Sequence, residues 1–308
     1  MKKFKIIIII LILIISTGCT TTLTDKNNKQ VKNEKTGQTI TKNILCKPTN
    51  KETINIYKKY NIDINKLPNC KDFKITSGKY EGPWTNFLIK PLSFIIIKLG
   101  SIFKNYGISV IIVSILIRFL MFPITKKTTM QSELMKKAQP ELSRIQKKYK
   151  DKKDQESMMK QNTEMMAVYK KYNINPAMGC LFAFIQLPLF IAFLEAIQRT
   201  PAIFEDKLLG LHLGTTPSIG ITSSSMISYL ILIVIIGLTT YISFKISMAN
   251  QQQDPNMNMN MMAPMMTGII ILTGIFMPSG LGLYWVASNI FTIIQTILLK
   301  KVVLKHEN

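Results

Sequence analysis

Residues 106–123 read YGISVIIVSILIRFLMFP, an apolar stretch interrupted by one charged residue, Arg118. A stretch of this length is typical of a transmembrane helix, near the lower limit of what spans a bilayer. An arginine at the centre of such a helix costs about 2.5–3.5 kcal/mol on insertion scales, so it needs water, an acidic partner or a route to the surface. The stretch therefore predicts a membrane protein whose first span carries a functional cation.

Two interpretations of Arg118 follow from its position. It lies five residues before Pro123, about 8 Å along a helix, so its side chain can reach the membrane surface by snorkelling. Alternatively, it lies in a water-filled, positively charged cavity that opens to the cytoplasm and receives an acidic residue of a passing polypeptide. Glu195 is the sole acidic residue in the predicted spans, and we expect it near the outer end of its helix.

Four further apolar stretches follow, so we predict five transmembrane helices. They occupy residues 106–123, 179–197, 226–244, 261–277 and 281–299, each 17 to 19 residues long. Residues 278–280 between the last two read Pro-Ser-Gly, and so short a connection predicts that these two helices form a hairpin.

Basic residues are unevenly distributed between the connecting segments. Residues 124–178 hold thirteen Lys or Arg, residues 198–225 hold two, and residues 300–308 hold three. Because basic segments near span ends are retained inside, we place 124–178, the loop 245–260 and the tail in the cytoplasm. The net charge of +22 thus belongs to connecting segments. This pattern argues against a soluble nucleic-acid-binding domain and leaves anionic lipid and ribosomal RNA as partners.

The first eighteen residues have the organisation of a signal peptide. Residues 1–5 carry three lysines, residues 6–15 are all Ile or Leu, and Ser-Thr-Gly-Cys follows at 16–19. Ten apolar residues rise about 15 Å, half of a hydrocarbon core of about 30 Å, which is too short for a stable span. Gly before Cys is similar to a lipobox, which predicts that residues 1–18 are removed and that Cys19 carries a lipid such as palmitate. Ordinary cleavage with a free Cys19 is the alternative.

Residues 19–83 are expected to form an extracytoplasmic, lipid-anchored tether. Residues 20–80 are rich in Thr, Asn and Lys, so they cannot bury enough apolar surface to offset the entropy of ordering a large core. Cys46 and Cys70 either form a disulfide in this exported segment or stay as free thiols. With a disulfide, residues 54–67 would form a small helical knot.

Residues 84–105 are apolar but contain three lysines, so we predict an amphipathic helix in the membrane interface rather than a span. At 100° per residue the polar side chains share one arc of about 140°. They are Lys90, Ser93, Lys98, Ser101, Lys104 and Asn105. Apolar residues occupy most of the remaining surface.

The basic segment 124–178 is predicted to form a helical hairpin. Its apolar residues recur at spacings of three, four and seven, which indicates two amphipathic helices with a turn at 151–154. Further along, six methionines lie between residues 257 and 266. They suit adaptable apolar contacts better than copper binding, since no Cys or His accompanies them.

Four motifs, in this order, resemble the YidC family of membrane protein insertases. They are Arg118 in the first span, YKKYNINP at 169–176 closing the basic loop, NPAMGCLFAFIQLPLF at 175–190, and PSGLGLYWVASN at 278–289 with Gln295 after it. Together they cover about residues 84–300. The chain departs from the family at Phe182, where many relatives have Pro, and in its short tail, 300–308, where some relatives have a long basic one.

The resemblance implies an all-α membrane protein: five transmembrane helices around a hydrophilic groove, with an interfacial amphipathic helix and a cytoplasmic helical hairpin. It implies an insertase and chaperone of integral membrane proteins in the bacterial inner (plasma) membrane, acting alone or with the Sec translocon. The N-terminus would be extracytoplasmic and the C-terminus cytoplasmic. Arg118 would attract nascent membrane proteins without reacting, and the hairpin would contact the nascent chain or the ribosome; a solvated hairpin without a partner is the alternative.

Residues that would line the groove or guide a sliding substrate follow from the same resemblance. They are Phe182, Gln186, Pro188, Phe190, Leu283, Tyr284, Trp285 and Asn289. For Gln186, Asn289 and Gln295, an interhelical hydrogen bond is an equally good structural role.

No cofactor, metal or enzymatic centre is expected. The sequence has no Gly-Lys-Ser/Thr phosphate loop, and its two histidines, His212 and His306, belong to no cluster of potential metal ligands. Two other classes of protein stay open. A small-solute transporter would use Arg118 to bind an anion but would have repeated halves, which we do not find. A lipoprotein scaffold would only assemble with a translocon.

Overall fold

The computed structural model describes residues 20–152, 154–175, 177–248 and 259–305; of residues 177–185, 247–248, 259–262 and 300–305 it describes the backbone alone. The chain divides into two compact units. The first comprises Met1–Leu116, Leu187–Ile236 and Ile271–Ala287, and the second comprises Ile117–Gln186, Gly237–Ile270 and Ser288–Asn308. The predicted signal peptide, 1–18, and the predicted lipid site, Cys19, lie outside the described residues.

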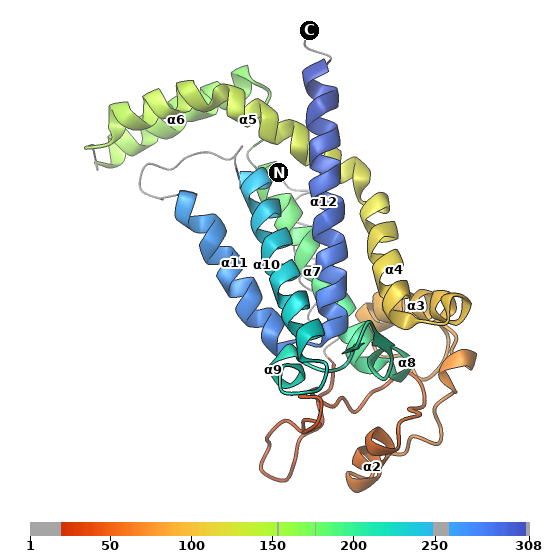
Figure 1. Cartoon of the computed structure of the whole chain (residues 1–308). Helices are drawn as coiled ribbons and strands as arrows, with labels where there is room; N and C mark the ends of the chain where they lie inside the picture. Colours follow the sequence, from red (N-terminus) through yellow and green to blue (C-terminus); the bar gives the residue numbers. More distant parts are fainter. Residues whose placement is uncertain (1–19, 153, 176, 249–258, 306–308) are drawn as a thin grey trace. The chain divides into compact units, whose positions relative to one another are not determined.

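The structure is mostly helical, in agreement with the predicted fold class (Figure 1). The α-helices are α2 (Lys51–Lys59), α3 (Lys90–Phe103), α4 (Tyr106–Leu120), α5 (Phe122–Tyr149), α6 (Gln155–Lys171), α7 (Ala177–Arg199), α8 (Pro201–Phe204), α9 (Pro217–Gly220), α10 (Met226–Met248), α11 (Met259–Phe276) and α12 (Ser279–Lys305). A 3-10 turn, η1 (Cys70–Asp72), and a π-helical turn, η2 (Thr85–Ile89), precede α3. Strands β1 (Lys207–Leu208) and β2 (Leu211–His212) pair antiparallel.

Three helices in the described part of the chain are long and apolar enough to cross a membrane: Thr85–Phe103, Met226–Ile246 and Ser279–Leu299. A fourth arises if α4 and α5, which are bent by 62°, form one broken span. The bend falls where Pro123 stands at the start of α5, because proline lacks the backbone N–H that would continue the hydrogen bonding of α4. These apolar helices support a multi-pass membrane protein. The number of five spans and the interfacial place of residues 84–105 stay predictions.

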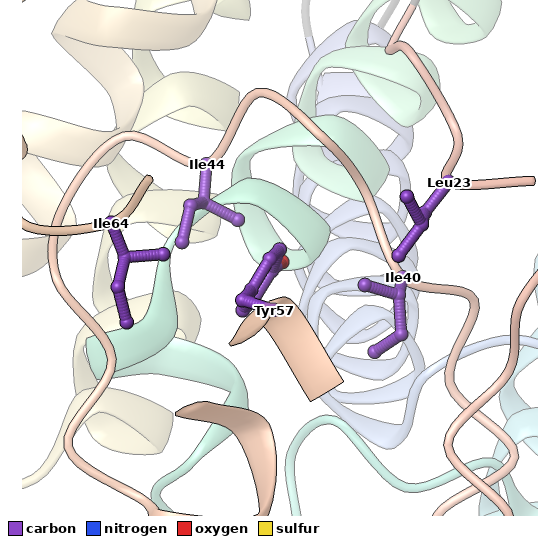
Figure 2. Close-up of a cluster of buried hydrophobic side chains, with 5 residues drawn as sticks. All are labelled: Leu23, Ile40, Ile44, Tyr57 and Ile64. Atoms are coloured by element: carbon purple, nitrogen blue, oxygen red, sulfur yellow. The ribbon is translucent and has the colours of Figure 1, made fainter. Parts of the chain in front are cut away.

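The segment 20–83, named the exported segment because the sequence predicts its export, is more ordered than its composition predicts. Its small core is made of Leu23, Ile40, Ile44, Tyr57 and Ile64 (Figure 2). Isolated bridges such as Thr22 with Thr41 pair its first part, and a disulfide joins Cys46 to Cys70. Composition alone missed this core because four of its five residues lie outside the amphipathic helix α2, at separate places in the chain.

Helices α5 and α6 pack against each other as a hairpin (Figure 1), which confirms the two helices predicted from residue spacing. Their shared core consists of Ala138, Leu142, Val168, Tyr169 and Ile174. Asp154 is the N-cap of α6 and accepts a hydrogen bond from the Ser157 N–H at 2.8 Å. The turn therefore falls within residues 151–154, where the sequence placed it.

Candidate functional site

Arg118 lies in the last turn of α4, in the second unit, and only 5% of its surface is exposed. Its Nε donates to Ser288 Oγ at 2.5 Å, and its Nη2 donates to Gln186 Oε1 at 2.8 Å. These two acceptors, a hydroxyl and an amide oxygen, orient the planar guanidinium. The side chain is thus held between groups of α7 and α12, while the water-filled cavity around it stays a prediction.

Further polar pairs in the second unit lie along the same helix, α12. Asn289 Nδ2 donates to Thr240 Oγ1 of α10 at 3.0 Å, and Gln295 Nε2 donates to Thr125 Oγ1 of α5. Ser288 and Gln295 are both buried and lie seven residues apart, so they share one face of α12. Each of these amides thus makes an interhelical hydrogen bond, which does not prevent it from lining a groove.

The residues predicted to guide a sliding substrate lie mainly in the first unit. Phe190 of α7 meets Trp285 of α12 edge to face at 5.4 Å between ring centroids. Phe193 stacks on Tyr284 at 4.1 Å. Pro188 and Leu283 are half-buried, while the side chain of Phe182 lies outside the described residues. The structure therefore forms two aromatic contacts between α7 and α12, Phe190 with Trp285 and Phe193 with Tyr284.

Sequence reasoning missed several polar residues of both units. Ser288, Thr240 and Thr125 went unnoticed because a single hydroxyl barely changes the hydropathy of an apolar helix. The available signal was that Ser and Thr in such helices tend to face other helices rather than lipid. Arg199, at the end of α7, was counted only as a loop charge, yet it is completely buried.

Two ion-pair clusters with the same composition join α5 to α6. Glu141 Oε1 accepts from Lys171 Nζ at 2.6 Å and from the Tyr172 hydroxyl at 2.8 Å. The same arrangement recurs at 2.6 and 2.9 Å with Glu164, Lys148 and Tyr149. The lysine, and then the tyrosine, hold the pKa of each carboxyl below its ordinary value. These acids serve the hairpin itself, so the many other lysines of this segment leave a cationic surface.

Among the residues that the structure describes, no three His, Cys, Asp or Glu side chains lie close enough together to hold a metal ion.

Comparison with known proteins identifies the family of this chain. Residues 98–307 match the family described as 60Kd inner membrane protein. "Membrane protein insertase YidC 2" of Listeria innocua is 38% identical over 219 residues, covering 71% of this chain and 72% of the relative. "Membrane protein insertase MisCA" of Bacillus subtilis is 38% identical over 219 residues, covering 70% of this chain and 79% of the relative.

A solved YidC insertase structure is similar to 80% of this chain, and the similarity covers 50% of that protein, with 23% identity and a TM-score of 0.48. A TM-score of this size supports no argument about the fold, which is described from the helices of this chain. The sequence matches extend over more than two thirds of the chain and of each relative. The chain therefore belongs to the 60Kd inner membrane protein family, the family of the YidC membrane protein insertases.

Proposed function

We propose that this protein inserts integral membrane proteins into the bacterial plasma membrane and helps them fold, with Arg118 as the group that attracts the client. Family membership supports the proposal, because relatives at 38% identity are named membrane protein insertases. The single observation that carries it is the buried guanidinium of Arg118, oriented by Ser288 and Gln186.

In this proposal Arg118 binds reversibly and takes part in no covalent step. A carboxylate about 4 Å from a guanidinium gains about 4 kcal/mol at an effective dielectric constant of 20. A client segment of about 20 apolar residues gains roughly 0.3–0.6 kcal/mol per residue in mid-membrane, hence roughly 10 kcal/mol in all. Partition of the client into lipid therefore outweighs the attraction. Release then needs no nucleotide hydrolysis.

The client's path follows from which residues are polar and which are aromatic. Its short polar tail would meet Arg118 in a hydrophilic groove that is open to cytoplasm and lipid but closed on the outside. Its apolar segment would slide along the predicted spans 179–197 and 281–299. The contact between Phe190 and Trp285 supports a smooth apolar surface there.

The other proposed partners follow from the predicted topology. A lipid on Cys19 would hold the N-terminus outside, and the C-terminus would lie in the cytoplasm. The basic hairpin, α5 and α6, would contact the ribosome, because its excess of lysines suits ribosomal RNA. Action with the Sec translocon is part of the same proposal.

The experiment that tests the function replaces Arg118 by Gln and by Lys and measures insertion of several clients with acidic tails. Lys245 is exposed on α10 in the same unit, outside the basic hairpin, so Lys245→Gln removes an equal charge and is the matched control. A hydrogen bond between charged groups contributes about 1.5–3 kcal/mol, so we expect Arg118→Gln to lower insertion about tenfold or more. Arg118→Lys should retain part of it, and Lys245→Gln nearly all.

Other outcomes identify the other classes of protein. A scaffold predicts that every client inserts normally in Arg118→Gln, and this result would contradict the proposal. A transporter predicts the loss of solute flux in the same variant without a loss of insertion. Clients without an acidic residue in the tail provide an internal control, because they have nothing for the cation to attract.

A further inference from the structure

Arg199, the last residue of α7, is enclosed by groups from the exported segment and from the start of the helix that follows it. Its Nη2 lies 2.5 Å from Glu81 Oε2, and its Nη1 donates to Thr85 Oγ1 at 3.1 Å. Its Nε donates to the backbone oxygen of Asn43 at 2.8 Å. Glu195, one turn earlier on α7, lies 3.9 Å from Nη1. Contacts to three of its nitrogens fix the position of this side chain.

The exported segment also completes the backbone at the end of α7. The last carbonyl groups of a helix have no partners within it. Here the Leu45 N–H donates to the Arg199 carbonyl at 2.7 Å, and the Thr41 hydroxyl donates to the Gln198 carbonyl at 3.3 Å. Residues 41–45 therefore supply the hydrogen-bond donors that cap α7.

The same segment contacts the connection after α7 at two further places. Thr49 donates to Glu205 Oε2 from its N–H at 2.9 Å and from its hydroxyl at 2.6 Å. The Thr216 N–H donates to the Thr36 carbonyl at 2.8 Å. Gly37, the residue after Thr36, has a φ of +69°, and a Cβ there would lie 2.3 Å from Thr216 Oγ1. Glycine therefore permits the close approach of residues 36–37 to Thr216.

The start of α3 packs on the end of α7 as well. Trp84 Nε1 donates to Glu195 Oε1 at 3.0 Å, and the Thr200 hydroxyl donates to Ser93 Oγ at 3.1 Å. Ser93 is fully buried, so part of the polar arc predicted to face water instead faces α7. Phe193, six residues before Arg199, stacks on Tyr284 of α12. The end of α7 is thus fixed within the first unit, and its aromatic contact with α12 depends on that position.

We propose that the exported segment is a clamp that fixes the C-terminal half of α7, and that Arg199 is the positioning residue around which it closes. The inference rests on the proposed function, since α7 is one of the helices along which a client would slide. The family match begins only at residue 98. The proposed clamp therefore gives a role to residues 20–83, which lie before the matched region. A tether requires length alone, whereas a clamp requires these particular contacts.

The first test measures the clamp without measuring insertion. Trypsin is added to the outer face of right-side-out membrane vesicles, where the thirteen lysines of residues 20–83 are potential cleavage sites. We expect wild type to resist and Arg199→Gln to be cut about tenfold or more faster, because the loss of a buried cation leaves acids unpaired. Arg199→Lys keeps the charge but not the planar fork, so it should give an intermediate rate.

Lys207→Gln is the matched control, because Lys207 is the other basic residue between α7 and α10 and is exposed. It should be cut at the wild-type rate. Equal cleavage of Arg199→Gln and wild type would overturn the clamp. Glu81→Gln changes the other partner of the Arg199 ion pair and is the milder variant. It should also speed cleavage, so the test does not depend on a single variant that could fail to fold.

The second test measures insertion per molecule of protein in the membrane. Residues 21–79 are replaced by a Gly/Ser linker of equal length, which keeps a tether but removes the clamp. We expect this variant and Arg199→Gln to insert clients about threefold or more slowly, with partial rescue in Arg199→Lys. If both insert normally while Arg118→Gln does not, the clamp is wrong and the proposed function stands. If Arg118→Gln inserts normally while trypsin protection requires Arg199, the function is wrong and the clamp stands.

Discussion

Two buried arginines, one in each unit, are held in opposite ways. Arg199 pairs with Glu81 at 2.5 Å and lies near Glu195, whereas Arg118 donates to the neutral oxygens of Ser288 and Gln186. A cation enclosed with carboxylates has its charge satisfied within the protein. In the proposed function, Arg118 instead uses its charge on a carboxylate of the client. The proposal therefore separates an arginine that builds the protein from one that acts on its client.

The largest difference between the two arginines is expected in the stability of the protein. Replacing Arg199 should lower the stability more than replacing Arg118, whereas replacing Arg118 should lower insertion more. Arg199→Leu leaves the Glu81 and Glu195 carboxylates without their cation, which costs about 3–5 kcal/mol. Arg118→Leu leaves the Ser288 hydroxyl and the Gln186 amide oxygen without their donor, which costs about 1–3 kcal/mol. Thermal unfolding of the purified protein in detergent, followed by tryptophan fluorescence, checks this, because Trp84 donates directly to Glu195. Equal losses in the two variants would remove the distinction.

A smaller effect is expected from the neutral groups that orient Arg118. Ser288→Ala and Gln186→Leu each remove one acceptor but leave the cation, so we expect insertion of clients with acidic tails to fall about three- to tenfold. Thr292→Ala is the control, since the Thr292 hydroxyl donates to the Ser288 carbonyl within α12. If Ser288→Ala inserts at the wild-type rate while Thr292→Ala does not, the orienting role assigned to Ser288 is wrong.

The sequence predicted the elements whose signal is carried by many residues. The helical class and the α5–α6 hairpin follow from long periodic patterns, and Arg118 was recognisable because a charge in an apolar stretch is costly. The sequence could also pair Cys46 with Cys70 as one of two alternatives. Each of these inferences used local composition or spacing.

What the sequence could not predict depends on residues far apart in the chain. Ser288 lies 170 positions from Arg118, and Glu81 lies 118 positions from Arg199. The core of the exported segment unites Tyr57 of α2 with apolar residues from separate places in the chain. Arg199 was counted only as a basic residue of the segment 198–225, and its sequence position carries no sign of its partners. Only the folded exported segment shows that it is buried.

The smallest effect on stability is expected from the exposed ion pairs of the hairpin, in contrast to the interactions of the buried arginines. The hydrogen bond from Lys171 holds the pKa of Glu141 below the ordinary value of 4.5, and that from Lys148 does the same for Glu164. A carboxyl with a lowered folded-state pKa stabilises the fold above its unfolded pKa, and this contribution is lost as the pH falls through the folded pKa. The hairpin should therefore loosen as the pH drops below about 4.5.

Spin labels at the exposed positions Lys147 and Met159 report this loosening as a broader distribution of distances between α5 and α6. A variant with both Glu141→Gln and Glu164→Gln should be broader already at neutral pH and should change little on acidification. Salt should weaken the wild-type effect, because exposed pairs are screened. The interactions of Arg199, which is buried, should not respond to salt in this way. A wild-type hairpin that keeps one narrow distribution through the whole acid titration would show that its apolar core alone holds the two helices together.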